Sequence, residues 1–107
     1  MPRGAMVVQS GPVSADRDDE FNDWLDHTHI PEVLETPGFV GAQRYRLVQT
    51  VSDGGGGDPP EYLTVYEIEA DDVVAARDEL MATAAERTKS DSLRTDPRPR
   101  VYLYESL

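Results

Sequence analysis

The residues best suited to acid–base chemistry lie within one short acidic segment. His29 follows Asp26 by three residues, so both side chains fall on the same side of a helix. At the end of a helix, unpaired carbonyls and a carboxylate one turn back favour the imidazolium and place its titration near neutral pH. The sequence therefore predicts His29 as a general acid or base, with Asp26 beside it. The alternative is structural: His29 caps the C-terminus of the helix and bonds a backbone carbonyl.

A second histidine, His27, lies two residues before His29. The two rings point roughly 200° apart around a helix, so we expect His27 to face solvent. Two histidines at this spacing chelate a metal poorly from a helix, and the chain has no HExxH motif. We therefore expect no metal site in this segment.

Five other side chains can bind or orient a small ligand. Trp24 shares an apolar helical stripe with Phe21 and Leu25, so it either packs in the core or forms the wall of a pocket. Strand tyrosines can orient a flat polar ligand or relay a proton, or they pack between strands. A strand arginine can hold a carboxylate or an oxyanion, or it forms an ion pair between subunits. The predicted substrate-binding residues are Trp24, Asn22, Tyr45, Tyr66 and Arg44.

Length and charge limit the classes of protein to consider. The chain has 107 residues, the size of one domain, and we expect a single domain over 1–107. Its formal charge of −11 disfavours nucleic acid and anionic membrane surfaces as partners. It has no cysteine, so thiol chemistry is excluded. Without an apolar run long enough for a signal peptide or a membrane span, a cytoplasmic protein is expected.

Hydrophobic patterns and breakers predict six elements. The segment Asp16–Glu20 loads the start of the first helix with acid, and Pro31 is expected to end that helix and open a short second turn. Asp71 or Asp72 is expected to cap a second helix that frays near Thr88. The expected strands are 4–9, 39–51 with a bulge at Gly41, 61–69 and 100–105. Between the second and third strands, 52–60 contains four consecutive glycines and is expected to be a flexible loop.

This order, strand–helix–strand–strand–helix–strand, predicts an α+β fold of the ferredoxin-like βαββαβ type. Its sheet would be four-stranded and antiparallel, with both helices on one face. Several strands carry apolar or aromatic residues on both faces, and two helices can cover only one of them. We therefore expect a homodimer in which the two uncovered faces meet.

Several short motifs in residues 20–46 carry a resemblance to known proteins. Glu20-Phe21, Trp24, His29 before Ile30-Pro31, and then Pro37-Gly38-Phe39 resemble the EthD-like group of the dimeric α/β-barrel superfamily. The resemblance implies a barrel formed by two subunits and a pocket between each subunit's helices and sheet. It also implies that the histidine one residue before Ile30-Pro31 faces this cavity.

The resemblance implies a pocket but no particular substrate, and three functions stay open. The first is a small cofactor-independent enzyme that moves protons on an aromatic, polyketide-like or lactone substrate, as cyclases, isomerases and decarboxylases do. The second is a cofactorless monooxygenase of the antibiotic-biosynthesis type. The third is a non-catalytic module that binds a small molecule or serves assembly. Haem peroxidases also belong to the superfamily, but no cofactor is expected here.

Overall fold

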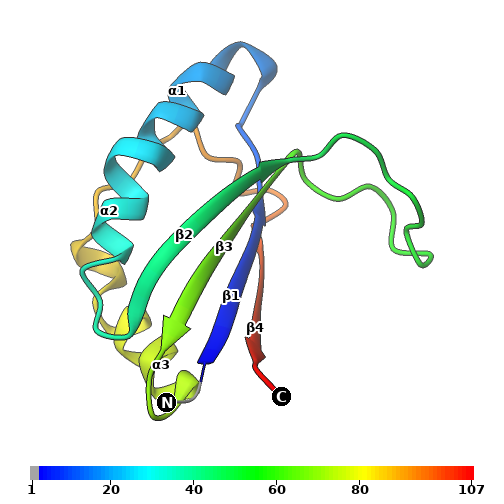
Figure 1. Ribbon diagram of the computed structural model, residues 1–107. Helices are drawn as coiled ribbons and strands as arrows, with labels where there is room; N and C mark the ends of the chain where they lie inside the picture. Colours follow the sequence, from blue (N-terminus) through cyan, green and yellow to red (C-terminus); the bar gives the residue numbers. More distant parts are fainter. Residues whose placement is uncertain (1–2) are drawn as a thin grey trace.

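The computed structural model describes residues 3–107 and shows one antiparallel sheet covered on one face by helices (Figure 1). The sheet has four strands in the order β2-β3-β1-β4, and every neighbouring pair is antiparallel. This is the ferredoxin-like α+β fold, so the predicted fold class is confirmed. The strands are β1 (Arg3–Ser10), β2 (Phe39–Arg46), β3 (Tyr62–Glu69) and β4 (Arg100–Glu105). None of the helices in this part of the chain is long and apolar enough to span a membrane.

The first helix does not end at Pro31, which corrects the expectation from sequence. After a 3-10 turn, η1 (Ala15–Arg17), it runs through α1 (Asp18–Trp24), a π-helical turn η2 (Leu25–His29) and α2 (Ile30–Val33). In η2 the backbone N–H of Ile30 bonds the carbonyl of Leu25, five residues back. Such a wide turn displaces the carbonyl that the ring of Pro31 would meet in an α-helix, so the proline fits without a break.

The second helix, α3 (Val73–Ala82), begins as predicted and ends early. The carboxylate of Asp72 accepts hydrogen bonds from the backbone N–H groups of Val74 and Ala75, at 2.9 and 3.2 Å. Asp72 is therefore the cap. The chain then tightens into a 3-10 turn, η3 (Ala84–Glu86), so the helix does not continue to Thr88 as expected.

Strand β2 is bulged as predicted but shorter than predicted. Its pairing with β3 shifts register between Phe39 and Gly41. The strand ends at Arg46 rather than Val51, and a bond from the N–H of Leu47 to the carbonyl of Glu61 closes the hairpin. The segment 47–61 then projects well beyond the sheet, because few of its side chains have anything to pack against (Figure 1).

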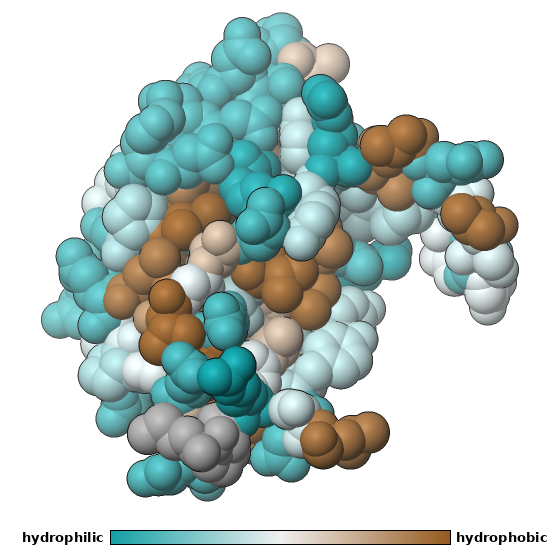
Figure 2. Space-filling view, in the orientation of Figure 1, coloured by the Kyte–Doolittle hydropathy of each residue, from teal (hydrophilic) through white to brown (hydrophobic). Residues whose placement is uncertain are grey.

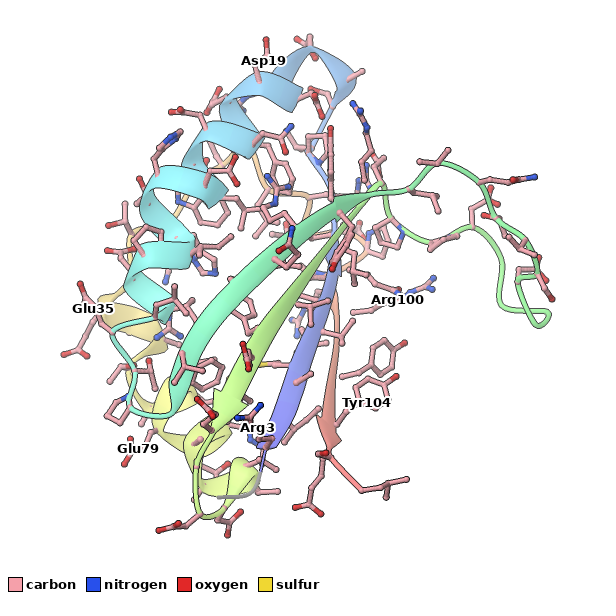
Figure 3. The ribbon with its side chains drawn as sticks, viewed as in Figure 1. Arg3, Asp19, Glu35, Glu79, Arg100 and Tyr104 are labelled. Carbon is pink, nitrogen blue, oxygen red and sulfur yellow. The ribbon has the colours of Figure 1, made fainter. Side chains whose placement is uncertain are left out.

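The core lies between the helices and the inner face of the sheet. Its buried side chains are Met6, Val33, Phe39, Tyr66, Ile68, Val73, Ala76 and Leu80. In the part of the chain that the structure describes, no helix covers the outer face of the sheet, and its edge tyrosines Tyr45, Tyr102 and Tyr104 are about half exposed. Tyr104 points away from the helices in Figure 3. The two faces of the sheet therefore differ in burial, and the sequence pattern anticipated this difference.

Gly38 is required where the chain turns from α2 into β2. Its φ is +93°, and an added Cβ would lie 3.3 Å from the Cβ of Ala70 and 3.4 Å from that of Ala76. We predict that Gly38→Ala lowers the free energy of unfolding, measured in urea, by about 1–3 kcal/mol. Gly54→Ala is the control, because Gly54 also has a positive φ, +61°, but nothing lies within 4 Å of its added Cβ. Equal losses in the two variants would contradict the packing argument.

Candidate functional site

A cavity of about 220 Å³ lies between the helices and the inner face of the sheet. In the space-filling view, apolar side chains also gather between the two layers (Figure 2). Met6, Val8, Leu25, Val33, Leu80, Met81, Leu93, Pro99 and Val101 form the apolar part of the lining. The remaining lining residues are Ser10, Trp24, His29, Thr64, Tyr66 and Arg87. An apolar cavity with a few polar groups is the usual form of a small-molecule site.

His29 is partly buried and lines this cavity, stacked on Trp24. The two ring centroids are 4.7 Å apart and the planes differ by 28°. Within residues 3–107 the Nδ1 atom of His29 is buried without a hydrogen-bond partner. His27 lies outside, where its ring pairs with Asp23 at 3.0 Å and is 74% exposed, as expected.

The surroundings of His29 favour the neutral imidazole, which corrects the expectation of a stabilised imidazolium. Burial lowers its pKa below the ordinary value, the positive charge of Arg87 lowers it further, and Glu32 opposes both. The expectation is wrong because the helix continues past His29 to Val33, so the backbone carbonyls near the ring are bonded within the helix. The neutral form of the ring therefore predominates at pH 7.

Trp24 and Glu32 tie the first helix to the segment that follows η3. The indole Nε1 of Trp24 donates to the carbonyl of Thr88 at 3.2 Å. The carboxylate of Glu32 accepts from both the backbone N–H and the hydroxyl of Thr88, each at 2.9 Å. These bonds lower the pKa of Glu32 and keep it ionised. They also hold the first helix against the segment after η3, beside the cavity.

Tyr66 contributes a phenol to the cavity from the middle of the sheet. The residue is 2% exposed, and burial raises the pKa of its hydroxyl to about 12, although Arg44 and Arg87 act in the opposite direction. The phenol is therefore protonated at neutral pH and can act as a hydrogen-bond donor.

Asp26, Asn22 and Arg44 form a separate polar cluster and do not line the cavity. Arg44 Nη1 bonds Asp26 Oδ1 at 3.0 Å, and its guanidinium lies 5.2 Å from the ring centre of Tyr62. Asn22 Nδ2 donates to the hydroxyl of Tyr62 at 3.2 Å. Asp26 is turned toward Arg44 rather than the cavity because the residues of the wide π turn are spaced differently around the axis from those of an α-helix.

Tyr45 is placed differently from what the sequence predicted, and Arg87 was not among the predicted site residues. Tyr45 is on the outer face of the sheet, 51% exposed, and away from the cavity. Arg87 lines the cavity, and sequence reasoning did not select it. In the sequence Arg87 stands out only as the first residue of a basic stretch, 87–100. Such a stretch does not show which way one side chain points.

Three solved structures share the fold. One is a protein of Shewanella loihica PV-4 provisionally assigned as a monooxygenase, with a TM-score of 0.59 and 15% identity over 100% of this chain and 97% of that one. Another is HapK from Hahella chejuensis, with a TM-score of 0.57 and 13% identity over 97% and 90%. A third is an EthD-family protein from Bacillus halodurans C-125, with a TM-score of 0.51 and 14% identity over 100% of both chains.

These structures confirm the resemblance to the EthD-like group at the level of the fold. No curated protein matches the sequence significantly. Residues 11–89, most of the chain, match the model of a family described as a domain of unknown function, DUF4286. The chain therefore belongs to the DUF4286 family.

Proposed function

We propose that the protein is a small cofactor-independent enzyme that transfers a proton on an aromatic, polyketide-like or lactone ligand. The observation that carries this proposal is the imidazole of His29 on the wall of an apolar cavity, where burial lowers its pKa and favours the neutral form. A neutral imidazole on the wall of a cavity can take a proton from a bound ligand and return it. A cyclase, an isomerase or a decarboxylase needs such a step.

Two other cavity residues would orient the ligand. The indole of Trp24 offers a flat surface beside the ring of His29. The protonated phenol of Tyr66 can donate a hydrogen bond to a ligand oxygen. A ligand held against both is positioned for proton transfer, which supports a role in binding for these two residues.

Asp26, Asn22 and Arg44 would act through the helix rather than on the ligand. The contact of Asp26 with Arg44 ties the π turn to β2, and that of Asn22 with Tyr62 ties α1 to β3. Both contacts hold the helix that carries His29 against the sheet. We therefore assign them to positioning of the imidazole.

A cofactorless monooxygenase is the second candidate. It is favoured by the likeness to the Shewanella loihica protein that is provisionally assigned to that activity. In such an enzyme the cavity holds an electron-rich substrate that reacts with oxygen. Oxygen uptake during turnover separates this activity from proton transfer alone. A module that only binds a ligand would show neither uptake nor turnover.

The proposed reaction depends on His29. In a screen of aromatic polyketides, phenols and lactones, we predict that His29→Gln lowers kcat by about 10²–10⁴ for any compound that the native protein converts. His27→Gln is the control, since that ring is exposed on the same turn. The His29→Gln variant should still bind the compound, as monitored by the fluorescence of Trp24. Undiminished turnover in His29→Gln would overturn the catalytic assignment.

We also propose that the outer sheet face pairs with a second copy of the chain. The face is apolar at its centre, where Val7 lies between Val65 and Tyr102, and half-exposed tyrosines flank it. The projecting segment 47–61 adds Val48 and Val51, which are 93% and 92% exposed. Exposed apolar area of this kind is covered in most proteins by a partner, and a two-fold dimer matches each patch with itself.

Sedimentation velocity tests the dimer. We predict twice the monomer mass at micromolar concentration, and the monomer mass for Val7→Lys, because a buried unpaired charge at the centre of the interface is costly. Val74→Lys is the control, because Val74 is 48% exposed on α3, on the opposite side of the sheet. A native protein that sediments as a monomer would contradict the proposal.

A further inference from the structure

Arg87 places a positive charge in the lining of the cavity. It is partly buried, and among the lining residues within 3–107 it carries the only fixed positive charge. It also borders an adjoining cleft lined by Glu32, Glu35, Glu79 and Glu86. Glu35 and Glu79 are on the helix side of the molecule (Figure 3). A cation that lies between an acidic cleft and an apolar cavity calls for an explanation.

Within residues 3–107 Arg87 forms no ion pair, although the chain is strongly acidic. The ion pairs of the described residues involve other side chains, and no carboxylate lies within 4.0 Å of the Arg87 guanidinium. The other cations left unpaired there are Arg46, Lys89, Arg98 and Arg100, and all four are exposed to water. Arg87 is therefore the unpaired cation that is partly removed from solvent, where a compensating anion would stabilise it most.

The end of α3 fixes the position of this guanidinium. Arg87 Nη2 donates to the carbonyl of Leu80 at 2.9 Å, and Nη1 donates to the hydroxyl of Thr83 at 3.0 Å. These two bonds use two of the five N–H groups of an arginine, so three remain for a ligand. The positive charge is thus held in place before any ligand arrives, which lowers the cost of binding.

The charge of Arg87 reaches the two other titratable groups of the cavity. It lowers the pKa of His29 and also acts to lower that of Tyr66, while Glu32 opposes it at His29. His29 comes from η2, Tyr66 from β3 and Glu32 from α2, so all three elements place a titratable group within range of the guanidinium. The same positive charge would stabilise an anion formed near His29.

We infer that Arg87 binds the acidic oxygen of the ligand, and that the ligand is a small phenol or an enolised 1,3-dicarbonyl compound. This inference rests on the proposed function and specifies its substrate class. The O–H bond of the ligand breaks, the proton forms an N–H bond on His29, and the electron pair stays on the ligand oxygen as a phenolate or enolate beside Arg87. A carboxylic acid is already ionised at neutral pH and would leave no proton for His29.

The size and polarity of the cavity agree with this class. A volume of about 220 Å³ lies below the usual range of about 300–1,000 Å³ for sites of drug-sized ligands. One ring, or two small fused rings, is the size that fits. The apolar lining can pack against the ring of the ligand. Arg87, His29 and Tyr66 provide polar groups for the edge of that ring that carries the oxygen.

The test uses 4-nitrophenol, whose anion absorbs visible light, and nitrobenzene, which has the same ring without a hydroxyl. We expect binding to the native protein to lower the pKa of 4-nitrophenol by about one unit or more, which is a tenfold preference for the anion. In Arg87→Gln that shift should disappear, while nitrobenzene should quench Trp24 with unchanged affinity. Arg77→Gln is the control, because Arg77 is on the same helix and pairs with Asp78 at the surface. Titration of 4-nitrophenol is repeated with His29→Gln. Because this variant has no imidazole at position 29, its titration reports the protonation of the probe without that of His29.

The possible outcomes separate this inference from the proposed function. If nitrobenzene binds the native protein but the pKa of 4-nitrophenol does not fall, the role of Arg87 is wrong and the cavity remains a binding site. If neither probe binds, the cavity assignment fails, and the inference fails with it. If Arg87→Gln does not fold, Arg87→Lys takes its place. A smaller but measurable fall in the pKa of bound 4-nitrophenol supports the inference. A pKa equal to that of the free probe contradicts it.

Discussion

The rest of the candidate site depends on the π-helical turn η2 in the first helix. The bond from Ile30 N–H to the Leu25 carbonyl spans five residues and widens the helix just before Pro31. The helix therefore continues to Val33, which is buried in the core and lines the cavity. The same turn leaves His27 in solvent and carries the ring of His29 onto Trp24. With an ordinary α-helical end at Pro31, the ring would lie beside unpaired carbonyls and would hold its proton more tightly.

Contacts between the first helix and the residues after η3 fix the helical side of the cavity, opposite the strands that line its other side. Thr88 bonds both Trp24 and Glu32, and Arg87 bonds the last turn of α3. The residues after η3 thus connect the end of α3 to the first helix. Together these contacts place a neutral base, an indole face and a cation around one apolar space, and the proposed chemistry needs all three.

Part of this arrangement could be read from the sequence. Alternating apolar residues and turn signals predicted the four strands and their order along the chain, and Asp72 before an apolar run predicted a helix start. Other features could not be read, for physical reasons. A π turn has no clear residue signature, and without it the side of the helix that Asp26 faces is predicted wrongly. The direction of the Arg87 side chain depends on the residue at which α3 ends and η3 begins. Backbone hydrogen bonds, rather than residue types, determine that residue.

The neutral state of His29 is the central claim, and NMR titration of its imidazole ring tests it directly. Burial and the positive charge of Arg87 predict that the pKa of His29 lies below the ordinary histidine value of about 6.5, so that the neutral form predominates at pH 7. A pKa at or above the ordinary value would contradict the account, because the imidazole would then hold its proton more tightly when the ligand binds.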